Sequence, residues 1–116
     1  MNKPTVVFDF DGVIHSYWSG WQGVDVIPDL PVPGIKELIE DLRTDHEIAV
    51  VSTRCSTTDG QRAILNYLQS NGIKVDCVLA EKSPAICYVD DRAICFRGQT
   101  EGFADKIRGF KSWVQS

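Results

Sequence analysis

The chain alternates short, largely apolar runs with segments in which apolar residues recur at helical spacing. The runs have the length of strands and are bounded by polar or turn-forming residues; they cover 5–10, 47–53, 75–79 and 86–89, with a shorter run at 93–96. Strands that are apolar on both faces are typical of a parallel sheet covered on both sides. The pattern therefore predicts a mostly parallel sheet.

Helices are predicted between the strands and at the end of the chain. The first begins near Pro33 and has its apolar positions at Ile35, Leu38, Ile39 and Leu42. A second is expected over about 59–70, and the spacing of Phe103, Ile107, Phe110 and Val114 predicts a third. Alternating strands and helices indicate one α/β domain over 1–116, a Rossmann-like three-layer α/β/α sandwich.

Residues 13–32 follow neither periodicity. They combine aromatic residues with glycine and proline, which excludes a long helix. A loop of this length inside a small domain is usually functional. We therefore expect a flap loop whose Tyr17, Trp18 and Trp21 lie near the functional site and stack on a planar group or cover an apolar sheet edge.

Composition narrows the class of protein. Twelve Lys and Arg residues against sixteen Asp and Glu residues give a net charge of −4, which argues against a general binder of nucleic acids or anionic membranes. No apolar run is long enough for a signal peptide or a membrane span, so we expect a cytoplasmic protein without a membrane partner. The four cysteines lack zinc-site spacing, and Cys77, Cys87 and Cys95 are expected as small core residues.

Polar residues follow each predicted strand. They are Asp9 and Asp11, then Ser52, Thr53 and Arg54, then Lys82, and finally Asp90 and Asp91. Ligands of open α/β sheets bind beyond the carboxyl ends of the strands, where these residues are expected to meet. Arg54 either touches a substrate there or braces a carboxylate.

The acidic residues favour a divalent cation. Asp9 and Asp11 are alternate residues of an extended segment, so both carboxylates can face one ligand while Phe10 packs away. With Asp90 and Asp91, up to four carboxylates converge, and such hard oxygen ligands favour Mg²⁺. Lys82 and the hydroxyl of Ser52 or Thr53 would complement an anionic substrate.

In this order the residues resemble the four motifs of the haloacid dehalogenase superfamily. The matching segments are Asp9-Phe10-Asp11-Gly12-Val13, Val50-Val51-Ser52, Lys82 and Tyr88-Val89-Asp90-Asp91. The resemblance implies a phosphatase in which Asp9 is the nucleophile and Asp11 the general acid and base. It also implies that Ser52 and Lys82 contact the phosphoryl group, and that Mg²⁺ is held by Asp9, the backbone carbonyl of Asp11 and Asp90, with Asp91 either a further ligand or one step removed.

The intervals between these motifs are too short for a cap domain, so an open site is expected. Further candidate substrate contacts are Gly12, Thr53, Arg54 and Trp18. Capless relatives often act on large substrates or use a second subunit as lid, which leaves a nucleic acid and a homo-oligomer open. Three alternatives to a general phosphomonoesterase are a polynucleotide 3′-phosphatase, a non-catalytic phospho-ligand binder and a receiver-like module, although the acidic pair of a receiver domain precedes its other motifs.

Overall fold

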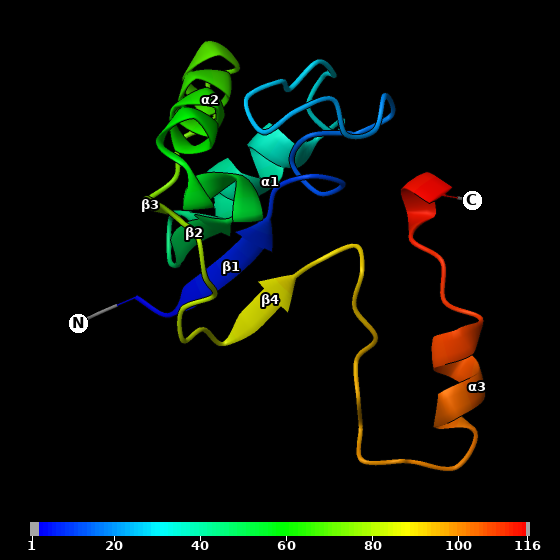
Figure 1. Ribbon diagram of the computed structural model, residues 1–116. Helices are drawn as coiled ribbons and strands as arrows, with labels where there is room; N and C mark the ends of the chain where they lie inside the picture. The colour runs from blue at the N-terminus through cyan, green and yellow to red at the C-terminus, as the bar shows by residue number, and fades with distance from the viewer. Residues whose placement is uncertain (1–2, 116) are drawn as a thin grey trace.

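The apolar runs form a central parallel sheet in the computed structural model, which describes residues 3–115 (Figure 1). Its strands are β1 (Thr5–Asp9), β2 (Glu47–Val51), β3 (Cys77–Leu79) and β4 (Cys87–Val89), in the order β3-β2-β1-β4. All neighbouring strands are parallel. The predicted Rossmann-like α/β fold is confirmed, and the described residues contain no cap domain.

The strand register aligns the carboxyl ends of the strands. Asp9 pairs with Val51 of β2, which in turn pairs with Leu79 of β3. On the other side of β1, Phe8 pairs with Val89, the last residue of β4. The segments that follow the four strands therefore leave the sheet at one edge, and this edge carries the residues predicted for the site.

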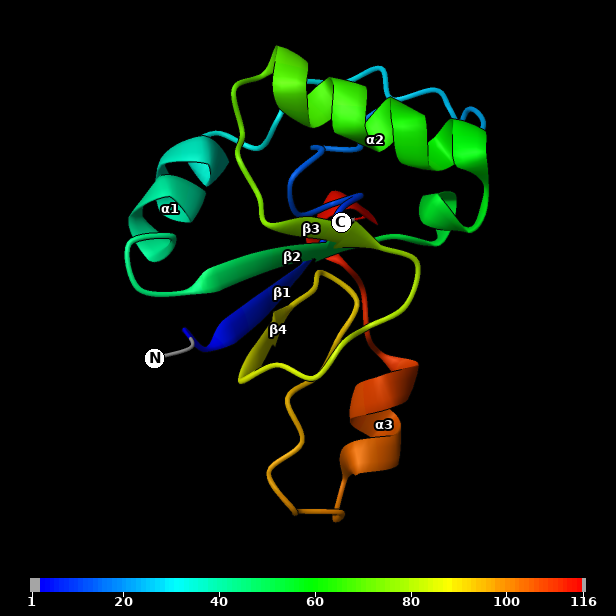
Figure 2. The same cartoon turned by 90° about the vertical axis from the view of Figure 1, so that its left-hand side faces the viewer.

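Helices α1 (Ile35–Leu42) and α2 (Thr58–Ser70) cover the same face of the sheet (Figure 2). Beneath them lies the main core, in which Phe8, Phe10, Ile39 and Ile64 are fully buried. A short 3-10 turn, η1 (Thr53–Ser56), links β2 to α2. The α2 helix begins where Thr57 Oγ1 accepts a hydrogen bond from the Gly60 N–H at 3.0 Å, a side-chain N-cap.

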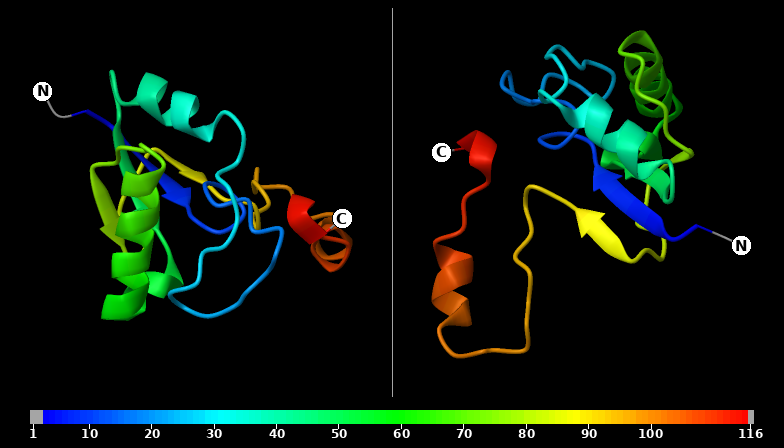
Figure 3. Two further views of the ribbon diagram at one scale, coloured as in Figure 1. Left: turned by 90° about the horizontal axis from the view of Figure 1, so that it is seen from above. Right: turned by 180° about the vertical axis from the view of Figure 1, so that it is seen from behind.

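The opposite face of the sheet has a much smaller core. Val7, Ala49 and Val51 are buried there, packed against Leu79 and Ala85. Residues 80–86, which join β3 to β4, form no helix. Helix α3 (Phe103–Arg108) lies on this side but stands away from the sheet (Figures 1 and 3). The third layer of the expected sandwich is therefore a short connection and a detached helix.

The C-terminal region differs from the sequence prediction. Residues 93–96 form no strand, because the chain leaves the sheet after β4. The predicted tail helix over 103–114 ends at Arg108, with Gly109 as its C-cap, and a separate 3-10 turn covers Trp113–Gln115. The detached segment raises the radius of gyration to 15.0 Å, against about 13 Å for a compact chain of this length.

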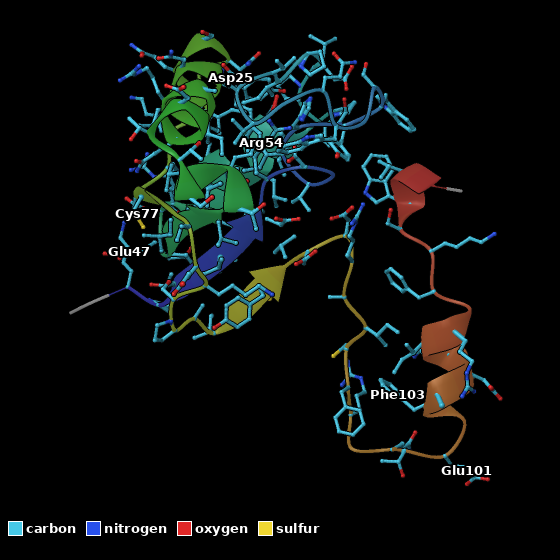
Figure 4. All side chains as sticks on the ribbon, viewed as in Figure 1. Asp25, Glu47, Arg54, Cys77, Glu101 and Phe103 are labelled. Atoms are coloured by element: carbon cyan, nitrogen blue, oxygen red, sulfur yellow. The ribbon has the colours of Figure 1, made fainter. Side chains whose placement is uncertain are left out.

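The cysteine prediction is wrong for three residues, since Cys77, Cys87 and Cys95 are exposed. Cys77 and Cys87 lie on the two short edge strands, where one side of the chain faces solvent, and Cys95 lies in the segment that leaves the sheet. Figure 4 shows Cys77 at the outer edge of the sheet. No helix among the described residues is long and apolar enough to span a membrane.

We predict that Gly60→Ala destabilises the protein, although alanine ordinarily stabilises a helix relative to glycine. A Cβ atom at Gly60 would lie 1.9 Å from the backbone oxygen of Arg54 and 2.9 Å from Val24 Cγ2. The free energy of unfolding should fall by about 1–3 kcal/mol, measured by urea denaturation.

Gly109→Ala is the matched control. Its Cβ would meet the backbone oxygen of Asp105 at 3.5 Å, an ordinary contact, so the change should stay within about 0.5 kcal/mol. A Gly60→Ala variant as stable as the wild type would contradict the close approach of α2 to η1.

Candidate active site

A cavity of about 210 Å³ lies at the carboxyl edge of the sheet. Its lining combines carboxylates, hydroxyls, aromatic rings and one exposed guanidinium: Asp9, Asp11, Tyr17, Trp21, Ser52, Thr53, Asp91 and Arg92. These residues come from the segments that follow β1, β2 and β4, together with the loop of residues 13–32. Most of the residues predicted from the sequence are therefore brought together, and Tyr17 and Trp21 supply a wall.

Three carboxylates form a cluster on one side of this cavity. Oxygen atoms of Asp9, Asp90 and Asp91 all lie within 4.8 Å of one another. Gly12 makes the approach of Asp91 feasible: a Cβ atom at Gly12 would lie 2.3 Å from Asp91 Oδ2, and its backbone φ of 86° is in the left-handed region. One oxygen of the cluster, Asp91 Oδ1, is buried without a hydrogen-bond partner.

The electrostatic state of Asp9 follows from this crowding. Burial of the carboxyl, and then the negative charge of Asp90, raise the pKa of Asp9 to about 7. Burial likewise raises the pKa of Asp91. Three carboxylates at this separation repel one another when all are ionised, so the cluster takes up protons or a cation near neutral pH.

The cluster fits a small divalent cation. Its donors are hard carboxylate oxygens, the type that Mg²⁺ prefers. The unpartnered Asp91 Oδ1 is an acceptor that a cation would satisfy. A cation would also offset both causes of the raised pKa of Asp9, burial first and then repulsion by Asp90. Among residues 3–115, Asp9, Asp90 and Asp91 are thus the carboxylates grouped closely enough to hold Mg²⁺ through their side chains.

Asp11 lines the cavity but lies outside the carboxylate cluster. Its Oδ2 accepts a hydrogen bond from Arg54 Nε at 2.8 Å, and its Oδ1 accepts from Arg54 Nη2 at 3.2 Å. Oδ1 also lies 2.8 Å from His15 Nδ1. Burial alone would raise the pKa of Asp11, but the hydrogen bonds from His15 and Arg54 and the charge of Arg54 outweigh it and lower the pKa. Asp11 is therefore held as a carboxylate.

Arg54 is fully buried and is saturated by its neighbours. Besides Asp11, its Nη1 donates to the backbone oxygens of Gly23, Val24 and Val26, at 2.8, 2.9 and 3.2 Å. The guanidinium thus ties the end of β2 to the loop of residues 13–32, and Figure 4 shows it inside the fold near this loop. Of the two roles expected for Arg54, the geometry favours bracing a carboxylate over touching a substrate.

His15, which the sequence offered only as a residue able to face a substrate from the loop, is instead buried against Asp11. Its ring is fully buried, 5.8 Å from the Phe10 ring and 5.6 Å from the Tyr67 ring. His15 Nε2 accepts the backbone N–H of Asp29 at 3.1 Å, which leaves the proton on Nδ1 to be donated to Asp11. The only signal in the sequence is its spacing of four residues from Asp11, which by itself carries little information.

The hydroxyl and lysine candidates differ in their placement. Ser52 Oγ lines the cavity and accepts the backbone N–H of Arg54 at 3.1 Å, so its own hydrogen is free to be donated to a ligand. Thr53 lies beside it. Lys82 lies outside the cavity lining; it is 53% exposed along its side chain, and its Nζ is 3.7 Å from Asp90 Oδ2. Its charge therefore acts on the acidic cluster.

Two predicted substrate contacts lie elsewhere. The backbone of Gly12 is occupied on both sides, because its N–H donates to the His15 oxygen at 2.8 Å and its oxygen accepts Trp113 Nε1 at 2.8 Å. Trp18 does not line the cavity; its ring meets the Trp113 ring edge-on at 5.3 Å. Gly12 and Trp18 thus connect the loop to the C-terminal turn, and neither faces the cavity.

Comparison of the chain with protein-family models, with curated proteins and with solved structures gives no match.

We predict a pH-dependent stabilisation by Mg²⁺. Asp9 binds a proton more tightly in the folded protein, with a pKa of about 7, than in the unfolded chain. The metal-free free energy of unfolding should therefore fall as the pH rises from about 5 to about 8. The carboxyls with lowered pKa values, Asp11, Asp29 and Asp76, titrate below this range. Mg²⁺ should raise the thermal midpoint at the upper pH and have little effect at the lower one, because protons compete for Asp9.

Asp91→Asn removes one ligand and one negative charge, so the metal-free variant should lose less stability with rising pH and gain little from Mg²⁺. Asp45→Asn, at an exposed carboxylate outside the site, is the matched control and should respond like the wild type. Equal stabilisation of Asp91→Asn and the wild type by Mg²⁺ would rule out this cluster as the binding site.

We further predict that Arg54→Lys is destabilising although it keeps the charge. A lysine ammonium cannot bind both oxygens of Asp11 and also reach the three loop carbonyls. The free energy of unfolding should fall by about 2–4 kcal/mol in urea denaturation. Arg62→Lys on α2 is the control: its guanidinium is exposed and lies 3.9 Å from Asp59, so a change of less than about 0.5 kcal/mol is expected. Similar losses in both variants would refute the structural role of Arg54.

Proposed function

We propose that this chain is a Mg²⁺-dependent phosphomonoesterase that acts through an aspartyl-phosphate on Asp9. The observation that carries the proposal is the contrast between two carboxylates in one cavity. Asp9 belongs to a cluster suited to a cation, whereas Asp11 is held as a carboxylate by Arg54 and His15. A cation bound by the cluster would keep Asp9 ionised for nucleophilic attack, which leaves Asp11 as the single acid–base group. The order of motifs resembling the haloacid dehalogenase superfamily supports the same reaction.

In the first step, a carboxylate oxygen of Asp9 attacks phosphorus, and the bond between phosphorus and the leaving oxygen breaks. The leaving oxygen takes a proton from Asp11. Asp9, Asp90 and Asp91, with the backbone carbonyl of Asp11 that the resemblance adds, would hold Mg²⁺, which supplies positive charge against the phosphoryl oxygens. The Ser52 hydroxyl donates to a phosphoryl oxygen, and Lys82 offsets negative charge from the side of Asp90.

In the second step, Asp11 removes a proton from a water molecule that attacks the phosphorylated Asp9. The phosphorus–oxygen bond to Asp9 breaks, phosphate leaves, and Asp11 holds the proton that the next leaving group requires. The hydrogen bonds from Arg54 and His15 suit this base role. The preceding acid role requires Asp11 to bind a proton at the expense of one of those hydrogen bonds.

A polynucleotide 3′-phosphatase is the second candidate function. Residues 92–111 hold five basic and two acidic residues, an excess of positive charge in an otherwise acidic chain. This segment starts at the cavity, which Arg92 lines. A phosphorylated strand end is a substrate that this charge would favour. A non-catalytic phospho-ligand binder and a receiver-like module remain the alternatives without hydrolysis.

We expect Mg²⁺-dependent release of phosphate from a generic aryl phosphate. Asp9→Asn should lower kcat by at least about 1,000-fold, because an amide cannot form the acyl phosphate. Asp11→Asn should lower it by about 100- to 10,000-fold through loss of proton transfer. Colorimetric phosphate detection with and without a chelator measures these rates.

Asp45→Asn makes the same chemical change at an exposed position outside the cavity and should keep wild-type activity. Turnover that does not need a divalent cation, or full activity in Asp9→Asn, would refute the mechanism. A 3′-phosphorylated oligonucleotide cleaved with a higher kcat/KM than small phosphomonoesters would favour the second candidate.

A further inference from the structure

The cavity has an aromatic wall that the proposed chemistry does not use. Trp21 and Tyr17 line the same cavity as Asp9 and Asp11. Trp21 is 56% exposed, and an exposed aromatic ring in a cavity wall can stack on a planar ligand. The solvent-facing side of the Trp21 indole ring is therefore available to a ligand.

The orientation of Trp21 is fixed from beneath. The guanidinium carbon of Arg54 lies 4.5 Å from the centroid of the Trp21 ring, so one ring face rests on a buried cation. That guanidinium is itself held by Asp11 and by the loop carbonyls. Among the described residues no other aromatic ring or cation contacts the opposite face of Trp21. One residue, Arg54, thus positions both the carboxylate of Asp11 and an open aromatic platform.

Tyr17 adds a second sign that this wall is built for a ligand. Its φ of 65° lies in the left-handed region, where non-glycine residues are uncommon, and Tyr17 has the only positive φ found among the described non-glycine residues. Backbone strain of this kind concentrates at ligand-binding sites. The ring of Tyr17 meets His15 edge-on at 5.8 Å, which connects this wall to the hydrogen-bonded partner of Asp11.

The size of the cavity limits what lies inside it. A volume of about 210 Å³ is below the range of about 300–1,000 Å³ that is typical of pockets for drug-sized ligands, so a whole nucleotide is not expected to be enclosed. A planar group attached to the sugar would therefore lie at the mouth of the cavity. There the open face of Trp21 offers stacking, and the exposed guanidinium of Arg92 offers a positive charge.

We propose that Trp21 is a stacking platform for a nucleobase, and that the substrate is a nucleoside phosphate, either free or at the end of a strand. This proposal rests on the phosphomonoesterase function proposed above and names its substrate class. Base stacking on an aromatic side chain tolerates any base, so selection should favour a planar base over no base and discriminate weakly among bases.

The test compares adenosine 5′-phosphate with ribose 5-phosphate, which differ only by the base. The wild type should have a higher kcat/KM for the nucleotide. Trp21→Leu should remove most of this preference, because kcat/KM for the nucleotide should fall about 5- to 100-fold more than kcat/KM for ribose 5-phosphate. Trp21→Phe should keep much of the preference, because it retains a planar ring.

Trp18→Leu is the matched control. It is the same change in the same loop at a tryptophan outside the cavity, so the preference for the nucleotide should stay at the wild-type value. Adenosine 3′-phosphate and a 3′-phosphorylated oligonucleotide serve as further substrates. The substrate with the highest kcat/KM shows whether the enzyme prefers a free nucleotide or the end of a strand. Equal cleavage of ribose 5-phosphate and every nucleotide by the wild type would overturn the proposal, as would a Trp21→Leu variant that loses both small substrates equally.

Binding measured without turnover separates this proposal from the proposed reaction. Asp9→Asn is titrated with adenosine 5′-phosphate and Mg²⁺, and tryptophan fluorescence is recorded with and without the additional Trp21→Leu change. Saturable quenching that requires Trp21, combined with a wild-type protein that hydrolyses no phosphate ester, would support the stacking platform and refute the phosphatase. Hydrolysis of aryl phosphate by the wild type, without any Trp21-dependent nucleotide binding, would support the phosphatase and refute the stacking platform.

Discussion

The buried guanidinium of Arg54 is the constraint on which the site depends. A buried cation is costly unless its charge is neutralised and its donors are satisfied, and both conditions are met by Asp11 and three loop carbonyls. The hydrogen bonds from Arg54 to the loop carbonyls hold the loop that follows β1 against the end of β2, although the loop contains no helix or strand. The arrangement also fixes Asp11 and Trp21, so the proposed acid–base group and the proposed stacking platform are both positioned by Arg54.

Two aspartates separated by one residue have opposite electrostatic environments. Asp9 ends β1 and points into a cluster of like charges, whereas Asp11 lies past the strand end, where Arg54 and His15 meet it. Phe10 between them is fully buried in the main core and holds the backbone that separates the two side chains. The division of roles between the carboxylates therefore follows from the position at which the strand ends.

Features set by local pattern were predictable from the sequence, and features set by distant partners were not. The apolar runs located β1 to β4, and the residues after them located Asp9, Ser52, Asp90 and Asp91, because parallel strands end at a common edge. The buried state of Arg54 depends on carbonyls of residues 23–26, which carry no periodicity, and that of His15 depends on Asp29.

Convergence of all four carboxylates was expected, but the hydrogen bonds of Asp11 to Arg54 and His15 hold it outside the cluster. The spacing of Phe103 and Ile107 indicated an apolar helix face. Spacing does not determine whether that face packs against the sheet, and no residue of α3 is buried.

The segment of residues 92–112 leaves the site and returns to it. Arg92 lines the cavity, and Trp113 Nε1 binds the backbone oxygen of Gly12, while α3 between them stands apart from the sheet (Figures 1 and 4). Since both ends are held at one place, the intervening length can grow or shrink without moving a residue of the cavity.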